Sequence, residues 1–462
     1  MMEFPYECAE QTFNRFYANA IGTRIVSGSP RMRQTFETWR NKDTTGLQSN
    51  LQKNEELKSV LLQETPWMID AQDESKQKRN IGILFSEERM KNELQSAISK
   101  LQNLQLSNGG FPWFAEGQDD RFITQYILTG IGRLKKMDAI PATVQVKINE
   151  MTKLAIAYLD TRIKEDYDAI RLKKVRTSSM PEIGDIQMNY LYMRSFFSNI
   201  PIASTSQTAV EYFASQEKKY WINQGKFAQG MIALTLFRNG DRQTAREILA
   251  SLKQNAIVNS TEGMYWKTVT PGIYWYQAPV ETESLLIEAF QEINQDAKSV
   301  DQMKTWLLNQ KQTRNWKTTK ATADACYALL MQGSDWLNQE QNVQISTGDG
   351  QLINSSNDSK TGIGYNKKRF EGSQVQSSMG NLTVSVSGKG TSPSWGAVYW
   401  QYFEDLDKIS APAKSKSLLS IAKKVFLEKN SDRGPVLVPI EDKGNLKIGD
   451  KIKIRIEIRS DR

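Results

Sequence analysis

The spacing of apolar residues changes once along the 462 residues, and this change restricts the fold more than any other feature. From about residue 8 to residue 336 the apolar residues recur at every third or fourth position, which is typical of amphipathic helices. After about residue 340 they alternate with polar residues, which is typical of strands. The chain is therefore predicted to be mainly α, with β segments in its last quarter.

The predicted buried faces of the helices include Phe13, Phe16, Tyr17 and Ala20; Ile123, Tyr126, Ile127 and Ile131; Met231, Leu234 and Leu236; and Leu285, Leu286 and Ala289. The clearest predicted strands contain Leu382, Val384 and Val386, and then Ile452, Ile454, Ile456 and Ile458. Between the two regimes lies a stretch rich in Gly, Asn and Ser at residues 347–359, which is a plausible boundary or hairpin loop.

The helical part also carries a weak internal repeat. A loop with Gly or Asn next to Trp precedes a helix with a threonine at three places, residues 105–126, 263–290 and 310–330, where the threonines are Thr124, Thr282 and Thr322. Such a repeat favours stacked helical hairpins that close into a double-layered ring, an α/α barrel. An ordinary helical bundle with Trp-containing loops is the alternative.

Composition excludes several kinds of chemistry. The chain has no His, which removes Ser-His-Asp and Cys-His nucleophiles and His-ligated zinc. Its two cysteines, Cys8 and Cys326, are too few for a four-thiolate metal site or a disulfide scaffold, although a bond between the two is an alternative. We expect no cofactor and no metal. The net charge of +8 is spread along the chain, so we expect no nucleic-acid partner.

The most specific motif is Pro5-Tyr6-Glu7-Cys8-Ala9-Glu10-Gln11-Thr12, which opens the first predicted helix. Residues three apart in a tight helical turn are neighbours, so the Cys8 thiol can reach the Gln11 carboxamide. A helix N-terminus favours the thiolate of Cys8. Attack of this thiolate on the carboxamide, with loss of ammonia, would give an internal thioester that an incoming amine, hydroxyl or water can open. The alternative is that Cys8 is a small buried residue and Gln11 a solvated one.

At this motif the chain resembles the thioester domain of the α2-macroglobulin and complement family, in its bacterial branch. The family pattern is Pro-Tyr followed by Cys, a small or apolar residue, Glu and Gln; vertebrate members have Gly where this chain has Glu7 and Ala9. The resemblance continues through the segments Asn108-Gly109-Gly110-Phe111-Pro112-Trp113, Trp316-Lys317-Thr318-Thr319-Lys320-Ala321-Thr322-Ala323 and Trp395-Gly396-Ala397-Val398-Tyr399-Trp400-Gln401-Tyr402-Phe403. The last of these resembles a strand of the β domain into which the bacterial thioester domain is inserted.

The resemblance implies three parts: a thioester-containing α/α toroid at residues 1–338, the C-terminal part of a CUB-like β domain at residues 339–412, and the start of a macroglobulin-like β domain at residues 413–462. The strong strand that ends near residue 462 has no following partners, so we expect a fragment of a larger bacterial protein. An export signal and a protease bait would then lie upstream, and the protein would be periplasmic, at the cell envelope or extracellular.

The function implied is that of an endopeptidase inhibitor in bacterial defence, which traps attacking proteases covalently through lysine amines in a single turnover. Cys8 would carry the acyl group and Gln11 would supply its carbonyl, while Glu10 and Tyr6 would shape the local environment. Some complement members use a second catalytic position, a histidine. It would fall somewhere in residues 171–184, where this chain has no His, so direct attack by amines is expected. The basic residues there, such as Arg171 and Lys173, are read as a solvated face.

Two other functions remain open. A covalent surface adhesin would use the same thioester on a different target. An enzyme on an α/α toroid, acting on a terpenoid or a sugar, would need acidic residues, and the nearest acidic pair is Asp119 and Asp120. No stretch approaches the roughly 18 apolar residues of a membrane span. The sequence does not indicate an oligomeric state.

Overall fold

The computed structural model of the chain describes residues 7–41, 79–172, 183–267, 278–314, 316, 318–331, 342–348, 350, 352–354, 368, 370, 372–387, 398–400, 419–431, 434–440, 446–447 and 449–460. It divides into two compact units, Met1–Ser394 and Trp395–Arg462. The predicted domain boundaries after residues 338 and 412 lie outside the described residues, so the division into three domains stays a prediction.

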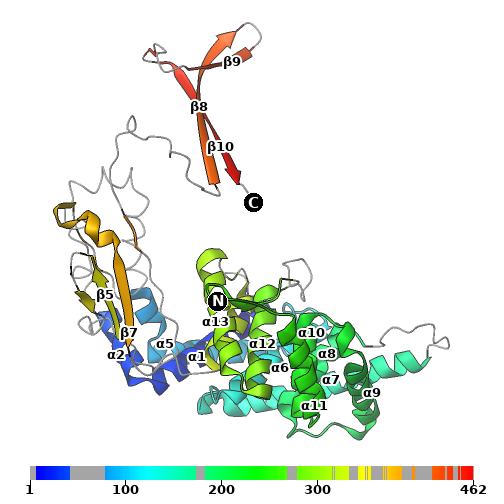
Figure 1. Cartoon of the computed structure of the whole chain (residues 1–462). Coiled ribbons are helices and arrows are strands. Elements are labelled where there is room, and N and C mark those ends of the chain that lie inside the picture. The colour runs from blue at the N-terminus through cyan, green and yellow to red at the C-terminus, as the bar shows by residue number, and fades with distance from the viewer. Residues whose placement is uncertain are drawn as a thin grey trace. The chain divides into compact units, whose positions relative to one another are not determined.

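The chain is mainly α, as its periodicity predicts (Figure 1). The described helices of the first unit are α1 (Ala9–Gly28), α2 (Pro30–Asn41), α5 (Glu87–Leu104), α6 (Arg121–Lys136), α7 (Gln145–Leu172), α8 (Asp185–Arg194), α9 (Ser204–Tyr220), α10 (Lys226–Arg238), α11 (Arg242–Gln254), α12 (Pro279–Asn294), α13 (Ala297–Arg314) and α14 (Thr319–Met331). Several begin at a polar residue whose side chain accepts a hydrogen bond from a backbone N–H of the first turn, which stabilises a helix start. Ser86, Asp120 and Asp241 cap α5, α6 and α11 in this way.

Six of the described helices contact one another in a closed order. Helix α1 packs against α6, α6 against α8, α8 against α10, α10 against α12, α12 against α14, and α14 returns to α1. We refer to these six as the inner helices. We refer to α5, α7, α9, α11 and α13 as the outer helices, and each of them packs against at least one inner helix (Figure 1).

The inner helices run in parallel. Glu10 and Thr319, at the starts of α1 and α14, are hydrogen-bonded. At the other end Arg238 and Lys136, in the last turns of α10 and α6, both pair with Glu292 near the end of α12. The N-termini of the inner helices therefore gather at one end of the cycle and their C-termini at the other.

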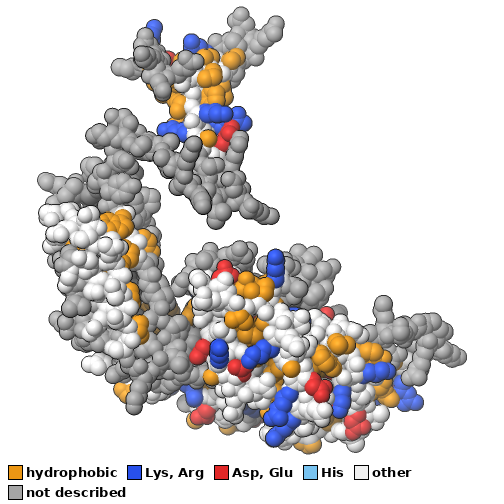
Figure 2. Space-filling view, viewed as in Figure 1, with side chains coloured by type: hydrophobic (Ala, Val, Ile, Leu, Met, Phe, Trp, Pro, Cys, Tyr) orange, Lys and Arg blue, Asp and Glu red, His pale blue; other side chains and the backbone are white. Residues whose placement is uncertain are grey.

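The hydrophobic core lies where the inner and outer helices meet, and the predicted apolar faces are buried in it. Phe13, Phe16, Ile127, Leu286 and Ala289 are at most 1% exposed. A smaller cluster joins the end of α1 to α2 and α5 through Val26, Phe36, Trp39 and Met90. Figure 2 shows basic and acidic side chains interspersed over the visible face of the helices.

Two short hairpins connect helices of the first unit. Strand β1 (Phe111–Pro112) pairs antiparallel with β2 (Asp119–Asp120), and β3 (Ile257–Asn259) pairs antiparallel with β4 (Gly263–Tyr265). The predicted repeat at residues 105–126 contains the first hairpin, and the one at residues 263–290 begins with strand β4 of the second; each hairpin connects an outer helix to an inner helix. In both, a glycine with positive φ lies at or just before the hairpin strand that packs on a helix, Gly109 at +90° and Gly263 at +88°.

The β segments form two small antiparallel sheets. In the first unit β5 (Asn342–Thr347) lies between β6 (Leu352–Asn354) and β7 (Leu382–Ser387). In the second unit β8 (Leu419–Ser431) lies between β9 (Gly434–Pro439) and β10 (Lys451–Ser460). The predicted strands at Leu382 and Ile452 are thus confirmed. Residues 398–400, the described part of the segment compared with a family strand, are not in a strand.

The alternating isoleucines of β10 do not lie in a core. Ile452, Ile454 and Ile456 are between 45% and 61% exposed, and hydrophobic side chains are visible on this sheet in Figure 2. Their register is nevertheless regular, since Ile454 faces Val425 and Ile456 faces Lys423 of β8.

Candidate functional site

Cys8 lies at the N-terminus of α1, in the position that precedes its first helical residue. Its backbone is extended, and its side chain is buried at 9% exposure. The backbone N–H of Cys8 donates a hydrogen bond of 3.2 Å to Oε1 of Gln11. The carboxamide of Gln11 therefore lies back over the start of the helix, next to the backbone of Cys8.

The turn that holds Cys8 and Gln11 is anchored from the β1–β2 hairpin. The N–H of Ala9 donates a hydrogen bond of 2.8 Å to the carbonyl oxygen of Trp113. This satisfies one of the backbone donors that a helix leaves free in its first turn. The Trp113 ring stacks on Phe122 at 6.2 Å between centroids and is 37% exposed. The sequence segment around Trp113, which the family resemblance singled out, is thus adjacent to Cys8.

Glu7 provides a second anchor, toward α5. Its carboxylate pairs with Lys100 at 2.5 Å and with Arg15 at 2.6 Å. The hydrogen bond from Lys100 lowers the pKa of Glu7, and the charge of Arg15 adds to this effect although partial burial opposes it. The residue before Cys8 is therefore an ionised carboxylate that ties the start of α1 to its neighbour.

Glu10 provides a third anchor, toward α14. Its Oε1 accepts hydrogen bonds from Oγ1 of Thr319 at 2.6 Å and from Nδ2 of Asn14 at 2.5 Å. Oδ1 of Asn14 in turn accepts a bond of 2.7 Å from the hydroxyl of Tyr126 on α6. Burial, together with the nearby charges of Asp324 and Glu10, raises the pKa of Tyr126 well above its usual value.

The structure describes only some of the other predicted site positions. Tyr6 lies outside the described residues, as do residues 173–182 within the predicted second position at 171–184. Within the described part, the guanidinium of Arg171 lies 5.8 Å from the ring centroid of Tyr167, and Gly184 precedes α8. No disulfide joins Cys8 and Cys326. Burial raises the pKa of Cys326.

The inner helices are joined to one another by buried charged residues, which the sequence analysis did not predict. Arg133 of α6 forms an ion pair with Asp324 of α14. The hydroxyls of Tyr192 and Tyr327 donate to the carboxylate of Glu288 at 2.7 and 3.1 Å. The Arg133 guanidinium also lies 3.5 Å from Glu288 and 4.6 Å from the ring centroid of Tyr327.

The same network continues toward the C-terminal ends of the inner helices. Arg238 bonds to Glu288 at 2.6 Å and to Glu292 at 2.7 and 2.9 Å, and Lys136 also pairs with Glu292. Burial alone would raise the pKa of Glu288, but the charges of Arg238, Arg133 and Lys136 lower it to about 2. A sequence signal existed: Glu288 and Glu292 stand at helical spacing among the apolar residues of α12, where a solvated glutamate is not expected.

Asp119 and Asp120, the nearest acidic pair in the sequence, both have structural partners. Asp119 accepts hydrogen bonds from Tyr158 at 2.5 Å, Asn108 at 3.1 Å and Arg162 at 3.1 Å. The bond from Tyr158 is the largest cause of a lowered Asp119 pKa. Asp120 caps α6 by accepting from the N–H of Ile123 at 3.0 Å. Neither carboxylate is arranged as a general acid paired with a base.

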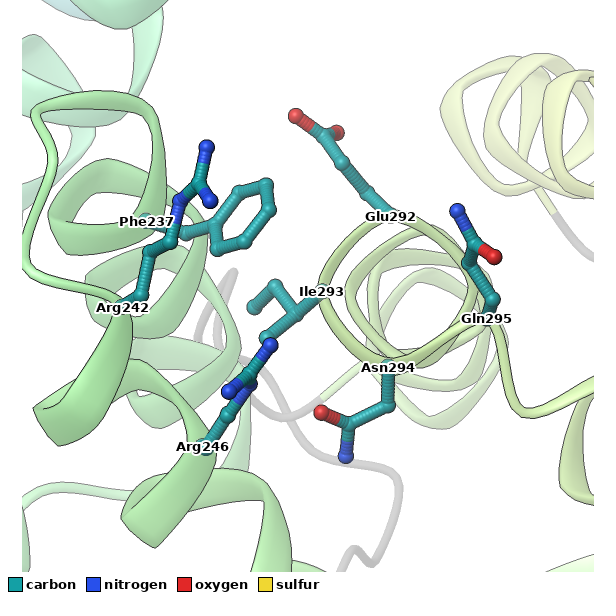
Figure 3. A pocket seen from close by; sticks show the side chains of 7 residues that line it. All are labelled: Phe237, Arg242, Arg246, Glu292, Ile293, Asn294 and Gln295. Carbon is teal, nitrogen blue, oxygen red and sulfur yellow. The ribbon is translucent and has the colours of Figure 1, made fainter.

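A cavity of about 530 Å³ lies between α11 and the end of α12. Figure 3 shows the guanidinium groups of Arg242 and Arg246 on one side and the side chains of Glu292, Asn294 and Gln295 on the other. Because the residues of α12 that line it are at the C-terminal end of that helix, this cavity is at the opposite end of the inner helices from Cys8.

The described residues offer neither a metal site nor a membrane-spanning helix. No group of three or more His, Cys, Asp or Glu side chains among them is arranged to hold a metal ion. Among the helices of the described ranges, none combines the length and the hydropathy needed to cross a bilayer.

No family model and no curated protein matches the chain. Among solved structures, it is similar to bacterial alpha-2-macroglobulins. A crystal structure of the native Escherichia coli protein from domain MG7 to the C-terminus is 13% identical, with a TM-score of 0.39 over 93% of this chain and 52% of the other. The E. coli protein activated by porcine elastase is 13% identical, with a TM-score of 0.40 over 81% of this chain and 29% of the other.

A Salmonella alpha-2-macroglobulin reacted with methylamine is 15% identical, with a TM-score of 0.37 over 94% of this chain and 22% of the other. The chain thus spans about half of the length of the first structure and less than a third of the other two.

Proposed function

We propose that Cys8 and Gln11 form an internal thioester. The Cys8 thiolate attacks Cδ of Gln11, the Sγ–Cδ bond forms, the Cδ–Nε2 bond breaks, and the nitrogen leaves as ammonia with the thiol proton. One observation carries this proposal: the Cys8 N–H donates to Oε1 of Gln11 at 3.2 Å, so the carbonyl to be attacked is held by the residue that bears the thiol.

The hydrogen bond has a chemical use as well as a structural one. A backbone N–H directed at Oε1 withdraws electrons from the carboxamide and stabilises the negative charge that develops on this oxygen during attack. A glutamine three residues after the start of a helix can also bond back to the backbone merely to cap the helix. Cysteine is not among the residues preferred at the position before a helix, so capping alone does not account for Cys8.

We infer from the sequence motif that the inner and outer helices are the α/α toroid of a thioester domain, and that the β sheets belong to CUB-like and macroglobulin-like domains. The chain then belongs to a bacterial α2-macroglobulin-like protein that is periplasmic, at the cell envelope or extracellular. It acts as an endopeptidase inhibitor: lysine amines of a protease attack the acyl carbon of Gln11, an amide forms, and the Cys8 thiolate leaves. Each molecule reacts once.

The first test is the intact mass of freshly purified protein, with Cys326→Ala as the background so that Cys8 is the sole thiol. We expect a mass lower by one ammonia than the sequence requires, and no titratable thiol. Methylamine should then add to the protein and release one thiol per molecule. A full mass with a free Cys8 thiol, unchanged by methylamine, would contradict the proposal.

Two variants are matched controls because each keeps the helix start. Cys8→Ser places a better capping residue before α1, and Gln11→Glu keeps an oxygen that can accept from the residue 8 N–H while placing a favourable charge in the first turn. Both variants should fold with unchanged helical content and show no loss of ammonia. Incubation with a lysine-bearing protease should give an adduct that resists denaturant, and neither variant should form it.

A further inference from the structure

Helices α1 and α14 are the first and the last of the inner helices, and they meet at the candidate site. The hydrogen bond between Glu10 and Thr319 joins them across 309 residues of sequence. Both side chains are partly buried. Glu10 directly precedes Gln11, so this contact is made by the same helical turn that carries Cys8.

The contact restrains the turn in a way that the other anchors do not. The bond from Ala9 to Trp113 and the ion pairs of Glu7 hold the chain just before and at the first helical residue. Glu10 is held by a different element, through Thr319 of α14, and within α1 by Asn14. Contacts from the hairpin, α5 and α14 together oppose a rotation of the first turn about the helix axis. Such a rotation would move the Gln11 carboxamide relative to the Cys8 thiol, and acyl transfer depends steeply on the placement of the reacting atoms.

We propose that Glu10 and Thr319 are positioning residues for thioester formation: their hydrogen bond holds the first turn of α1 in the rotation that presents Gln11 to Cys8. This inference rests on the proposed thioester. It assigns a role to Thr319, a residue that is far from the Cys8 motif in sequence and that the motif alone would not identify.

The test compares Thr319→Val with Thr319→Ser. Valine has the shape of threonine but cannot donate the hydrogen bond, whereas serine retains the hydroxyl. The control is Thr322→Val, on the same first turns of α14, because the Thr322 hydroxyl bonds only to the carbonyl of Thr318 at 3.0 Å among the described contacts. The readout is the ratio of thioester to uncyclised protein in intact mass spectra, with the thermal midpoint and helical content measured on the same samples.

We expect this ratio to fall about tenfold in Thr319→Val and to stay near that of the wild type in Thr319→Ser and Thr322→Val. The thermal midpoints of the two valine variants should agree. Should Thr319→Val fail to fold, Glu10→Ala removes the acceptor and leaves α14 unchanged, and it should show the same fall.

An unchanged ratio in Thr319→Val or Glu10→Ala, in a protein whose wild type has lost ammonia, would overturn the inference and leave the thioester standing. A ratio that falls equally in Thr322→Val would also overturn it, since the effect would then follow helix stability. A wild type that has not lost ammonia would instead refute the proposed function.

Discussion

Glu217 is a buried carboxylate whose two oxygens have no hydrogen-bond partner among the described residues. It lies on α9 at 1% exposure, and burial raises its pKa well above the usual value for Glu. A carboxyl whose pKa is raised by folding favours the folded state only while it is protonated. As the pH rises through the pKa of this glutamate in the unfolded chain, about 4.5, the folded state therefore loses stability relative to the unfolded one.

We predict that Glu217→Gln stabilises the protein by about 1–3 kcal/mol at pH 7, because the buried ionisable group is removed. The gain should vanish near pH 3, where Glu217 is almost fully protonated in both states. Urea unfolding at the two pH values measures this. Glu211→Gln, an exposed position on the same helix, is the control and should change little. An equal gain at both pH values would show that the charge of Glu217 is not the cause.

At the scale of elements, two glycines let the hairpins approach the outer helices. A Cβ on Gly109 would lie 2.2 Å from the carbonyl oxygen of Leu154 on α7, and one on Gly263 would lie 2.1 Å from that of Gln302 on α13. Both glycines have positive φ, which other residues adopt only at a cost. The hairpins are therefore pressed directly onto helix backbone, and β1–β2 brings the Trp113 carbonyl to the N-terminus of α1 in this way.

Gly240 separates the cost of a positive φ from the cost of a steric clash. Its φ is +96°, but no atom lies within 4 Å of the position that a Cβ would take. Gly240→Ala should cost about 1–2 kcal/mol of unfolding free energy through its backbone conformation alone. We predict that Gly109→Ala costs clearly more, since the hairpin or α7 must also shift. The measurement is the urea midpoint of both variants. Equal losses would mean that the close approach at Gly109 relaxes without cost.

Local patterns predicted the elements well and their long-range contacts poorly. The faces containing Phe13 and Leu286 follow from periodicity, and the proximity of Cys8 and Gln11 follows from their spacing, because both depend on the geometry of one helix. The Glu10–Thr319 bond joins two helices at the ends of the cycle, and the Ala9–Trp113 bond uses a backbone carbonyl that carries no side-chain signal. Neither can be derived from a local pattern. The apolar alternation of Ile452 to Ile458 predicted the strand, but not that Ile452, Ile454 and Ile456 are exposed.

For the molecule as a whole, the charges between the inner helices tie stability to pH. Glu288 is fully buried, and the charges of Arg238, Arg133 and Lys136 lower its pKa to about 2 despite burial. A carboxyl whose pKa is lowered by folding stabilises the folded state at any pH above its unfolded pKa. This stabilisation is lost as the pH falls from about 4.5 toward 2.

We predict that Glu288→Gln lowers the free energy of unfolding by about 3–5 kcal/mol at pH 7, because buried cations lose their partner. The difference from the wild type should narrow steadily below pH 4.5. Urea midpoints measured from pH 7 to pH 2.5 test this, with Glu247→Gln on the exposed face of α11 as the control. A difference that does not depend on pH would indicate that lost packing, and not lost charge, is responsible.

The contact between α1 and α14 also restricts when, during synthesis of the chain, the candidate site can be completed. A chain made at about 5–20 residues per second needs roughly 15 to 60 seconds to extend across the 309 residues that separate Glu10 from Thr319. Until then the first turn of α1 lacks its partner on α14. The chain segment between the two contacting residues contains nearly the whole cycle of helices, and bringing its ends together has an entropic cost. The segment around Cys8 is thus synthesised well before its partner on α14 and can make its final contacts only once α14 has emerged.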